Sequence, residues 1–204
     1  ALIPSYDHQT DSLMWYNGKL YAGNYQSCTI TEIDVEKGTA KPLFAIKNTA
    51  FSQYRMHAMT AGDGKVFGGS VPSSDARKGG VLVWFDYAKG LTYVAAGPDP
   101  EDVFYCDTSE NPANNVWYSA VTNEKMDFDA DDDGTDEADI TLNVDADGDG
   151  ELDKQPRFTG LIKNQTINAL VYKDGYIIGS TSRYGGSGAL TDGVGNACLF
   201  VYDI

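Results

Sequence analysis

The chain repeats one pattern three times, and this repeat restricts its fold more than any other feature. Each copy begins with Gln, runs through an alternating apolar strand and reaches an Asn-Gly or Asp-Gly pair. A second apolar run follows and ends in glycine, and a third, after a loop of variable length, ends in Asp. The three copies span Gln9 to Asp34, Gln53 to Asp86 and Gln165 to Asp203.

The dipeptides at 17–18, 63–64 and 174–175 predict tight hairpins, because Asn-Gly and Asp-Gly tolerate the positive φ that two-residue loops require. Further strands are expected at 40–46 and 91–96, so the first two copies each contain four consecutive antiparallel strands. The 13 Tyr and 22 Gly suit an all-β protein with tight turns. Four-stranded units with a period of about 45 residues predict the blades of a β-propeller. A single β-sandwich with accidental similarity is the alternative.

About three blades fall short of the four to eight that typically close a ring. We therefore expect either further blades in a longer protein or a homodimer, in which a second copy completes the ring. Bare sheet edges would otherwise invite aggregation. The predicted organisation is two blades in 1–97, an inserted acidic segment in 98–160 and a third blade, lacking its outer strand, in 161–204.

The acidic segment contains the pattern D-x-D-x-D-G twice, ending at Gly134 and at Gly150. Carboxylates at alternate positions of a tight turn can converge on one hard cation, as in the first half of an EF-hand loop. Position 12 of the second copy is Pro156, so a complete EF-hand is excluded. The alternative is a solvated acidic run. The predicted Ca²⁺ ligands are Asp129, Asp131, Asp133, Thr135 and Glu137 in the first loop, and Asp145, Asp147, Asp149, Glu151 and Asp153 in the second.

The net charge of −15 is concentrated in this segment. No basic patch is present, so nucleic acid is not expected as a partner. No apolar run approaches the length of a transmembrane helix. The three cysteines, Cys28, Cys106 and Cys198, form no zinc-binding pattern and are expected to be buried thiols, with one disulfide as the alternative. Calcium loops with few ligands suit a millimolar-calcium medium and favour an extracellular or cell-surface location.

The repeat resembles the propeller repeats of secreted bacterial proteins, including propeller domains attached to polysaccharide-processing enzymes. The likeness is carried by short motifs such as DGKVFGGSVP and DGYIIGSTSRYGG, and it covers nearly everything outside 98–160. The acidic loops are similar to the calcium loops of dockerins and thrombospondin type 3 repeats. The resemblance implies the propeller fold and leaves the function open.

In a propeller, the innermost strands and the loops that enter them carry most binding sites. Amides, arginines and aromatic rings around a shallow cavity suit sugars, because they offer directed hydrogen bonds and stacking surfaces. The repeated Gln also has a structural interpretation, as a bond to backbone between blades. The predicted ligand-binding residues are Gln53, Tyr54, Arg55, His57, Gln165, Asn168, Arg183 and Tyr184.

Three functions follow from these features. The first is an extracellular propeller module that binds an oligosaccharide, a polysaccharide or another surface partner and is stabilised by calcium. The second is a polysaccharide-active, lyase-like enzyme whose site includes Arg55, His57 and Arg183. The third is a purely structural interaction scaffold. No nucleophile constellation stands out, which favours the binding functions over catalysis.

Overall fold

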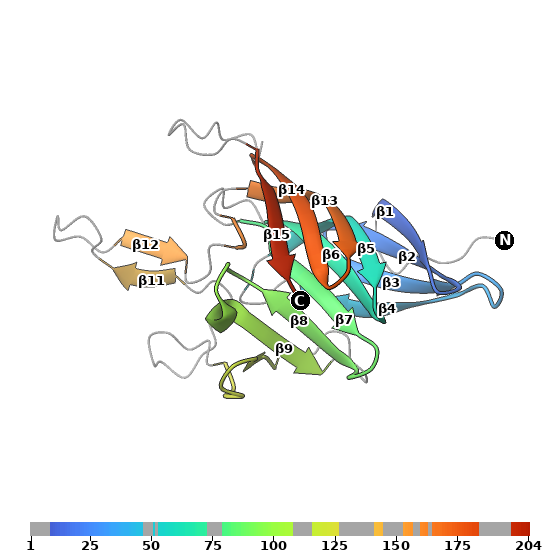
Figure 1. Cartoon of the computed structure of the whole chain (residues 1–204), viewed down its shortest axis with the longest axis horizontal. Helices are drawn as coiled ribbons and strands as arrows, with labels where there is room; N and C mark the ends of the chain where they lie inside the picture. Colours follow the sequence, from blue (N-terminus) through green and yellow to red (C-terminus); the bar gives the residue numbers. More distant parts are fainter. Residues whose placement is uncertain are drawn as a thin grey trace.

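The computed structural model describes residues 9–46, 51, 53–72, 79–107, 116–126, 141–144, 153–156, 160–162, 165–183 and 197–204. The fold is all-β, and its main sheet is strongly curled (Figure 1). Among the described residues, one 3-10 helical turn, η1 (Pro100–Asp102), lies between β8 and β9. Within these ranges, no helix has the length and hydrophobicity needed to cross a membrane.

The strands form three antiparallel meanders in chain order. The first meander consists of β1 (Gln9–Tyr16), β2 (Lys19–Tyr25), β3 (Thr29–Asp34) and β4 (Thr39–Ala45). The second consists of β5 (Gln53–Gly62), β6 (Lys65–Pro72), β7 (Leu82–Asp86), β8 (Leu91–Ala95), β9 (Val103–Asp107) and β10 (Tyr118–Ser119). The third consists of β13 (Gln165–Lys173), β14 (Tyr176–Arg183) and β15 (Leu199–Asp203). A separate hairpin pairs β11 (Thr141–Val144) with β12 (Asp153–Pro156).

The hairpin turns have the backbone that the sequence predicts. Asn17 and Gly18 have φ of 47° and 77°, and the pairs at 63–64 and 174–175 have positive φ as well. The third strands end at Asp34, Asp86 and Asp203, as expected. The fourth strands, β4 and β8, lie at the expected positions. The strand pattern of each repeat is therefore confirmed, while the closed propeller ring remains a prediction.

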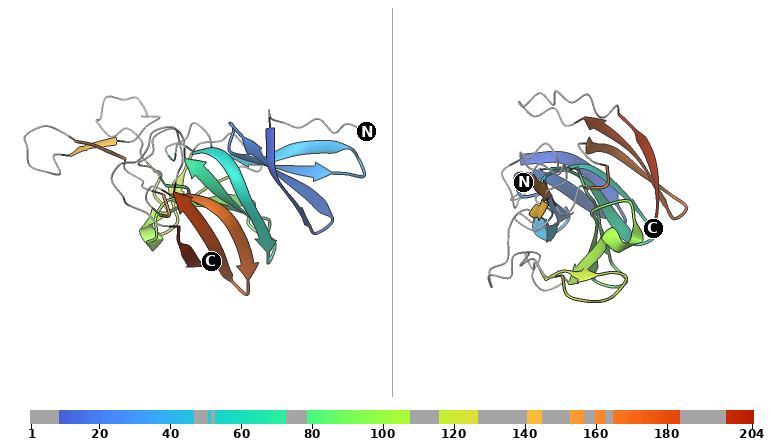
Figure 2. Two further views of the ribbon diagram at one scale, coloured as in Figure 1. Left: turned by 90° about the horizontal axis from the view of Figure 1, so that it is seen from above. Right: turned by 90° about the vertical axis from the view of Figure 1, so that its left-hand side faces the viewer.

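The second meander lies between the other two (Figure 2). One hydrophobic cluster joins the first and second meanders and includes Tyr21, Ile30, Met56 and Val66. Another joins the second and third meanders. It includes Phe67, Leu82, Trp84, Ile167, Leu170 and Ile177. The second meander therefore uses one face to meet the first meander and the opposite face to meet the third.

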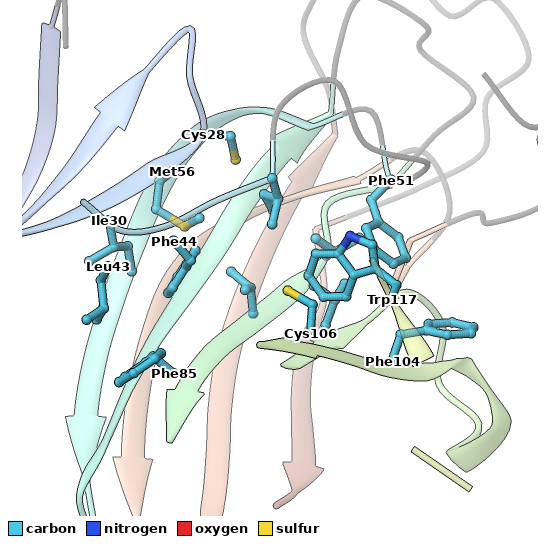
Figure 3. Packing of buried hydrophobic residues seen from close by; sticks show 14 of the residues in the cluster. Cys28, Ile30, Leu43, Phe44, Phe51, Met56, Phe85, Phe104, Cys106 and Trp117 are labelled. Atoms are coloured by element: carbon cyan, nitrogen blue, oxygen red, sulfur yellow. The ribbon is translucent and has the colours of Figure 1, made fainter. Parts of the chain in front are cut away.

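The segment that follows β8 packs into the first of these clusters. Trp117 is 1% exposed, and its ring lies 5.0 Å from that of Phe51 in an edge-to-face arrangement, next to Phe104 (Figure 3). This placement makes Phe104 and Trp117 part of the hydrophobic core. β9 is hydrogen-bonded to β8, from Leu91 opposite Asp107 onward. The second meander therefore continues into the range assigned to the acidic insert.

Cys28 and Cys106 are fully buried thiols in this core. Burial raises the pKa of Cys28 well above its ordinary value and that of Cys106 to about 12. Cys198 is half-buried, and its sulfur accepts a hydrogen bond from Gln165 at 3.7 Å.

Candidate functional site

Each first strand contains a β-bulge at the same place. The register shifts between Thr10 and Ser12, between Met56 and Ala58, and between Ile167 and Ala169. The extra residues are Asp11, His57 and Asn168, and all three are polar. A bulge re-aims its side chain and often lies beside a functional site. The repeat therefore places three polar residues at equivalent positions on strands that neighbour one another.

Around the first two bulges, Arg55 joins β5 to the first meander. Its Nε donates a hydrogen bond to Asp11, whose side chain is only 4% exposed. The guanidinium lies over the ring of Tyr25, 5.3 Å from the centroid, and residues 25 and 55 are paired in the sheet. Arg55 keeps 34% of its side chain exposed, so the cation is fixed in orientation and still reaches solvent.

Tyr54 completes this group. Its hydroxyl donates to the hydroxyl of Tyr25 at 2.6 Å, and the two rings meet edge to face at 4.8 Å. The hydrogen bond with Tyr54 raises the pKa of Tyr25 above its ordinary value, so the phenol of Tyr25 remains protonated at neutral pH. The result is a half-exposed cluster of two tyrosines and an arginine, which we call the Arg55 cluster together with Asp11.

His57 and Asn168 occupy the other two bulges. The Nδ1 atom of His57 is shielded from solvent and has no hydrogen-bond partner among the described residues. Asn168 is exposed, and its Oδ1 accepts a hydrogen bond from Thr166 at 3.0 Å. Each of the two residues therefore retains hydrogen-bonding groups that the described protein does not occupy.

Gln53 is buried and fully engaged within the chain. Its Nε2 donates to the backbone oxygens of Phe51 at 2.6 Å and of Gly79 at 3.3 Å. Its Oε1 accepts from Ser70 Oγ at 2.7 Å, and Ser70 in turn bonds the backbone of Val81. The side chain thus holds the segment before β5 to the loop between β6 and β7.

Gln165 repeats this clasp in the third meander. Its Oε1 accepts a hydrogen bond from Thr181, which also bonds the backbone nitrogen and oxygen of Cys198. Gln9 does not make this contact, because its side chain is exposed. Gln9 pairs with Tyr25, and this register position is occupied by Arg55 in the second copy and by Thr166 in the third. The repeated Gln thus has two equivalent structural positions rather than three.

The remaining predicted positions lie at the limits of the described chain. Arg183 is the last residue of β14, and only its backbone is described. Tyr184 lies outside the described residues, as do Asp129, Asp131, Asp133, Thr135, Glu137, Asp145, Asp147, Asp149 and Glu151. Asp153 is the first residue of β12, opposite Val144 of β11. The described residues contain no group of three His, Cys, Asp or Glu side chains suited to a metal ion.

Asp11 and Tyr25 belong to the cluster but were not among the predicted ligand-binding residues. A signal for Asp11 exists in the sequence, since Asp11, His57 and Asn168 each stand six residues before the Asn or Asp of their hairpin turn. Aligning the copies on the turn rather than on the initial Gln would have placed all three together. Tyr25 has no comparable signal, because its role depends on the pairing of β2 with β5.

A second polar region lies on the first meander, in a cleft of about 310 Å³. Its lysines already have carboxylate partners. Lys19 and Lys41 lie 2.7 and 3.6 Å from Glu32, and Lys37 lies 2.8 Å from Asp34. Because two carboxylates compensate most of the charge of the three lysines, the cleft offers an anion little net attraction, and the Arg55 cluster is the better candidate site.

No protein-family model matches the chain, and a search of curated proteins returned no match. Among solved structures, the chain is similar to the computationally designed Ika4 protein, with 12% identity and a TM-score of 0.32 over 100% of this chain and 98% of that one. It is also similar to the computationally designed Ika8 protein, with 11% identity and a TM-score of 0.29 over 96% of this chain and 46% of that one. At these TM-scores, the likeness carries no conclusion about fold or function.

Proposed function

We propose that the protein is an extracellular module that binds a carbohydrate at the Arg55 cluster and is stabilised by calcium in its acidic segment. The observation that carries the proposal is the pair of half-exposed tyrosines around an arginine held in a fixed orientation. Tyrosine rings can stack on the apolar face of a sugar, and phenol and guanidinium groups hydrogen-bond its hydroxyls. Because the guanidinium of Arg55 is already held in one orientation, it loses little conformational freedom when a ligand binds.

The charge balance at Arg55 favours a neutral sugar. Asp11 already compensates the guanidinium, so a uronate carboxylate would compete with a buried partner. Hydroxyl groups carry no such conflict, because they can accept from the remaining guanidinium N–H groups. A neutral glycan is therefore the ligand class that fits this cluster best.

A glycan array and titration calorimetry, run in millimolar calcium, test the binding site. Tyr54→Ala and Arg55→Lys should each weaken binding about 10-fold or more, because one removes a ring and the other removes the planar fork. Lys37→Ala, in the charged cleft, is the control and should leave the affinity unchanged. Binding that survives both cluster variants would refute this site, and the absence of any bound glycan would refute the function.

The calcium part of the proposal has its own test. The pairing of Val144 with Asp153 brings together the chain on either side of 145–152, the range that holds most of the second acidic loop. Such closure would help carboxylates at both ends reach one ion. Removing calcium with a chelator should lower the melting temperature, and Asp147→Asn with Asp149→Asn should make that response smaller, because only the first acidic loop would still bind the ion. A melting temperature that ignores both calcium and chelator would refute a structural calcium site.

The second candidate is a lyase-like enzyme, and the observation in its favour is the unpartnered Nδ1 of His57 close to Arg55 in sequence. An imidazole base could take the ring proton next to a uronate carboxylate while the bond to the glycosidic oxygen breaks, which leaves one unsaturated sugar and one new reducing end. Incubation with polysaccharides should then yield new reducing or unsaturated ends, and His57→Ala should abolish them. Products that persist in that variant, or no products from any polymer, would reject the enzyme.

A further inference from the structure

The three described meanders pack in a repeating head-to-tail order through two contacts. The first meander meets the second through a cluster that contains Tyr21 and Ile30. The second meets the third through a cluster that contains Phe67, Leu82 and Trp84. These contacts are heterologous, since one face of each meander meets the opposite face of the next (Figure 2).

The third meander exposes the face that its predecessors bury. Ile178 lies between Val171 and Val201 in the sheet, as Phe67 lies between Thr60 and Trp84. Phe67 is fully buried, whereas Ile178 is 41% exposed and Val201 68% exposed. Leu199, at the position of the buried Leu82, is 83% exposed. We call this surface the trailing face, formed by Val171, Ile178, Leu199 and Val201.

The first meander exposes the opposite kind of face. Leu13 lies across from Ala22, as Met59 lies across from Gly68 and Leu170 from Gly179. Met59 packs against the cluster that the first and second meanders share, and Leu170 lies beside Gly69 of the second meander, yet Leu13 is 65% exposed. Trp15, at the position of Ala61 and Tyr172, is 62% exposed. We call this surface the leading face, formed by Leu13 and Trp15.

We propose that the trailing face of one copy binds the leading face of a second copy, so that copies of this chain associate head to tail. Register positions support this association in addition to the exposed apolar surface. The two faces stand at the register positions that already meet twice inside the chain, and a third contact of the same kind continues the series. The proposal is independent of the carbohydrate site, since none of the six residues belongs to the Arg55 cluster.

One polar contact of the internal interface has a counterpart in the proposed one. Tyr172 donates its hydroxyl proton to Asp63, in the hairpin turn of the preceding meander. Trp15 stands at the register position of Tyr172, and Asp174 stands at that of Asp63. The indole N–H of Trp15 can donate a hydrogen bond, as the hydroxyl of Tyr172 does. The indole N–H of Trp15 in the second copy is therefore expected to face Asp174 of the first copy.

Sedimentation velocity across a dilution series of the whole chain tests the association, and two variants block one face each. Ile178→Lys with Val201→Lys blocks the trailing face, and Leu13→Lys with Trp15→Lys blocks the leading face. All four positions are exposed in the single chain, so the monomer fold should survive, and circular dichroism verifies this. Each blocked variant should raise the dissociation constant about 100-fold or more, because the interface would bury an unpaired charge. Val121→Lys, an exposed valine outside both faces, should behave as the wild type.

Mixing the two blocked variants distinguishes this mode of association from a symmetric one. Each variant retains the face that the other has lost, so an equimolar mixture should form a dimer although each variant alone stays monomeric. A wild type that remains monomeric at high micromolar concentration would overturn the proposal and leave the faces to a different protein segment. Dimers that persist in either blocked variant alone would overturn it as well.

Discussion

Replacing Gln53 with alanine separates a structural role from a binding role at this residue. The side chain makes three hydrogen bonds, to the backbone of Phe51 and Gly79 and to Ser70, and it is 2% exposed. At a net value of about 1 kcal/mol for each bond, and with buried carbonyls left without this donor, the loss should be about 3 kcal/mol. In a chain of this size, that corresponds to a melting temperature lower by about 6–12 °C.

Urea denaturation followed by circular dichroism measures this loss, with Gln9→Ala as the matched control. Gln9 begins the first copy of the repeat, but it is exposed, so its variant should change the stability by less than about 0.5 kcal/mol. Gln53→Glu should be worse than Gln53→Ala, because a carboxylate oxygen would then face backbone oxygens. Equal stabilities for Gln53→Ala and Gln9→Ala, together with weaker glycan binding by Gln53→Ala, would refute the structural role.

Three further predictions concern titration, reactivity and close packing. Burial alone would raise the pKa of Glu32, but hydrogen bonds from Lys19 and Tyr87 lower it, so its stabilisation is present above the ordinary pKa and is lost as the pH falls through the folded value. The stability advantage of the wild type over Glu32→Gln should therefore shrink in melting curves taken from pH 6 down to pH 3, and a constant gap would contradict this. Cys28 and Cys106 should resist a thiol reagent at neutral pH until the protein is unfolded, and mass-spectrometric labelling of either in the native state would count against their burial. Gly80→Ala should destabilise by more than about 2 kcal/mol in urea titrations, because its Cβ would lie 2.2 Å from a backbone oxygen, and a normal midpoint would show that the loop yields.

Local chemistry explains which parts of the fold the sequence predicted well. The hairpins at 63–64 and 174–175 depend on residues that tolerate positive φ, and this preference needs no knowledge of the neighbours. The third strands end where the alternation of apolar and polar residues ends, at Asp34, Asp86 and Asp203. The sequence did not predict β9 as part of the second meander, because the acidic composition of the following segment placed the predicted boundary before β9. Its pairing with β8 depends on a packed core around Phe104, which no short pattern indicates.

The candidate site was harder to predict than the strands, because it depends on register. Gln53 and Arg55 were both predicted to bind a ligand. Gln53 is hydrogen-bonded to the backbone, whereas Arg55, two residues further along β5, is partly exposed to solvent. The alternation of a strand assigns both to one face, and only the bulge between them and the pairing with Tyr25 separates their roles.

The bulges also explain why function would gather where the repeat is least regular. A strand that alternates without interruption commits every second side chain to a core, and in this chain both faces of the second meander are covered. The extra residue of each bulge, Asp11, His57 or Asn168, has no partner in the strand pairing, so the alternation does not commit its side chain to a core. The three copies keep the bulge but fill it with an acid, an imidazole and an amide. Conservation of the backbone irregularity with divergence of its side chain is what a scaffold needs if it is to vary a site without disturbing its core.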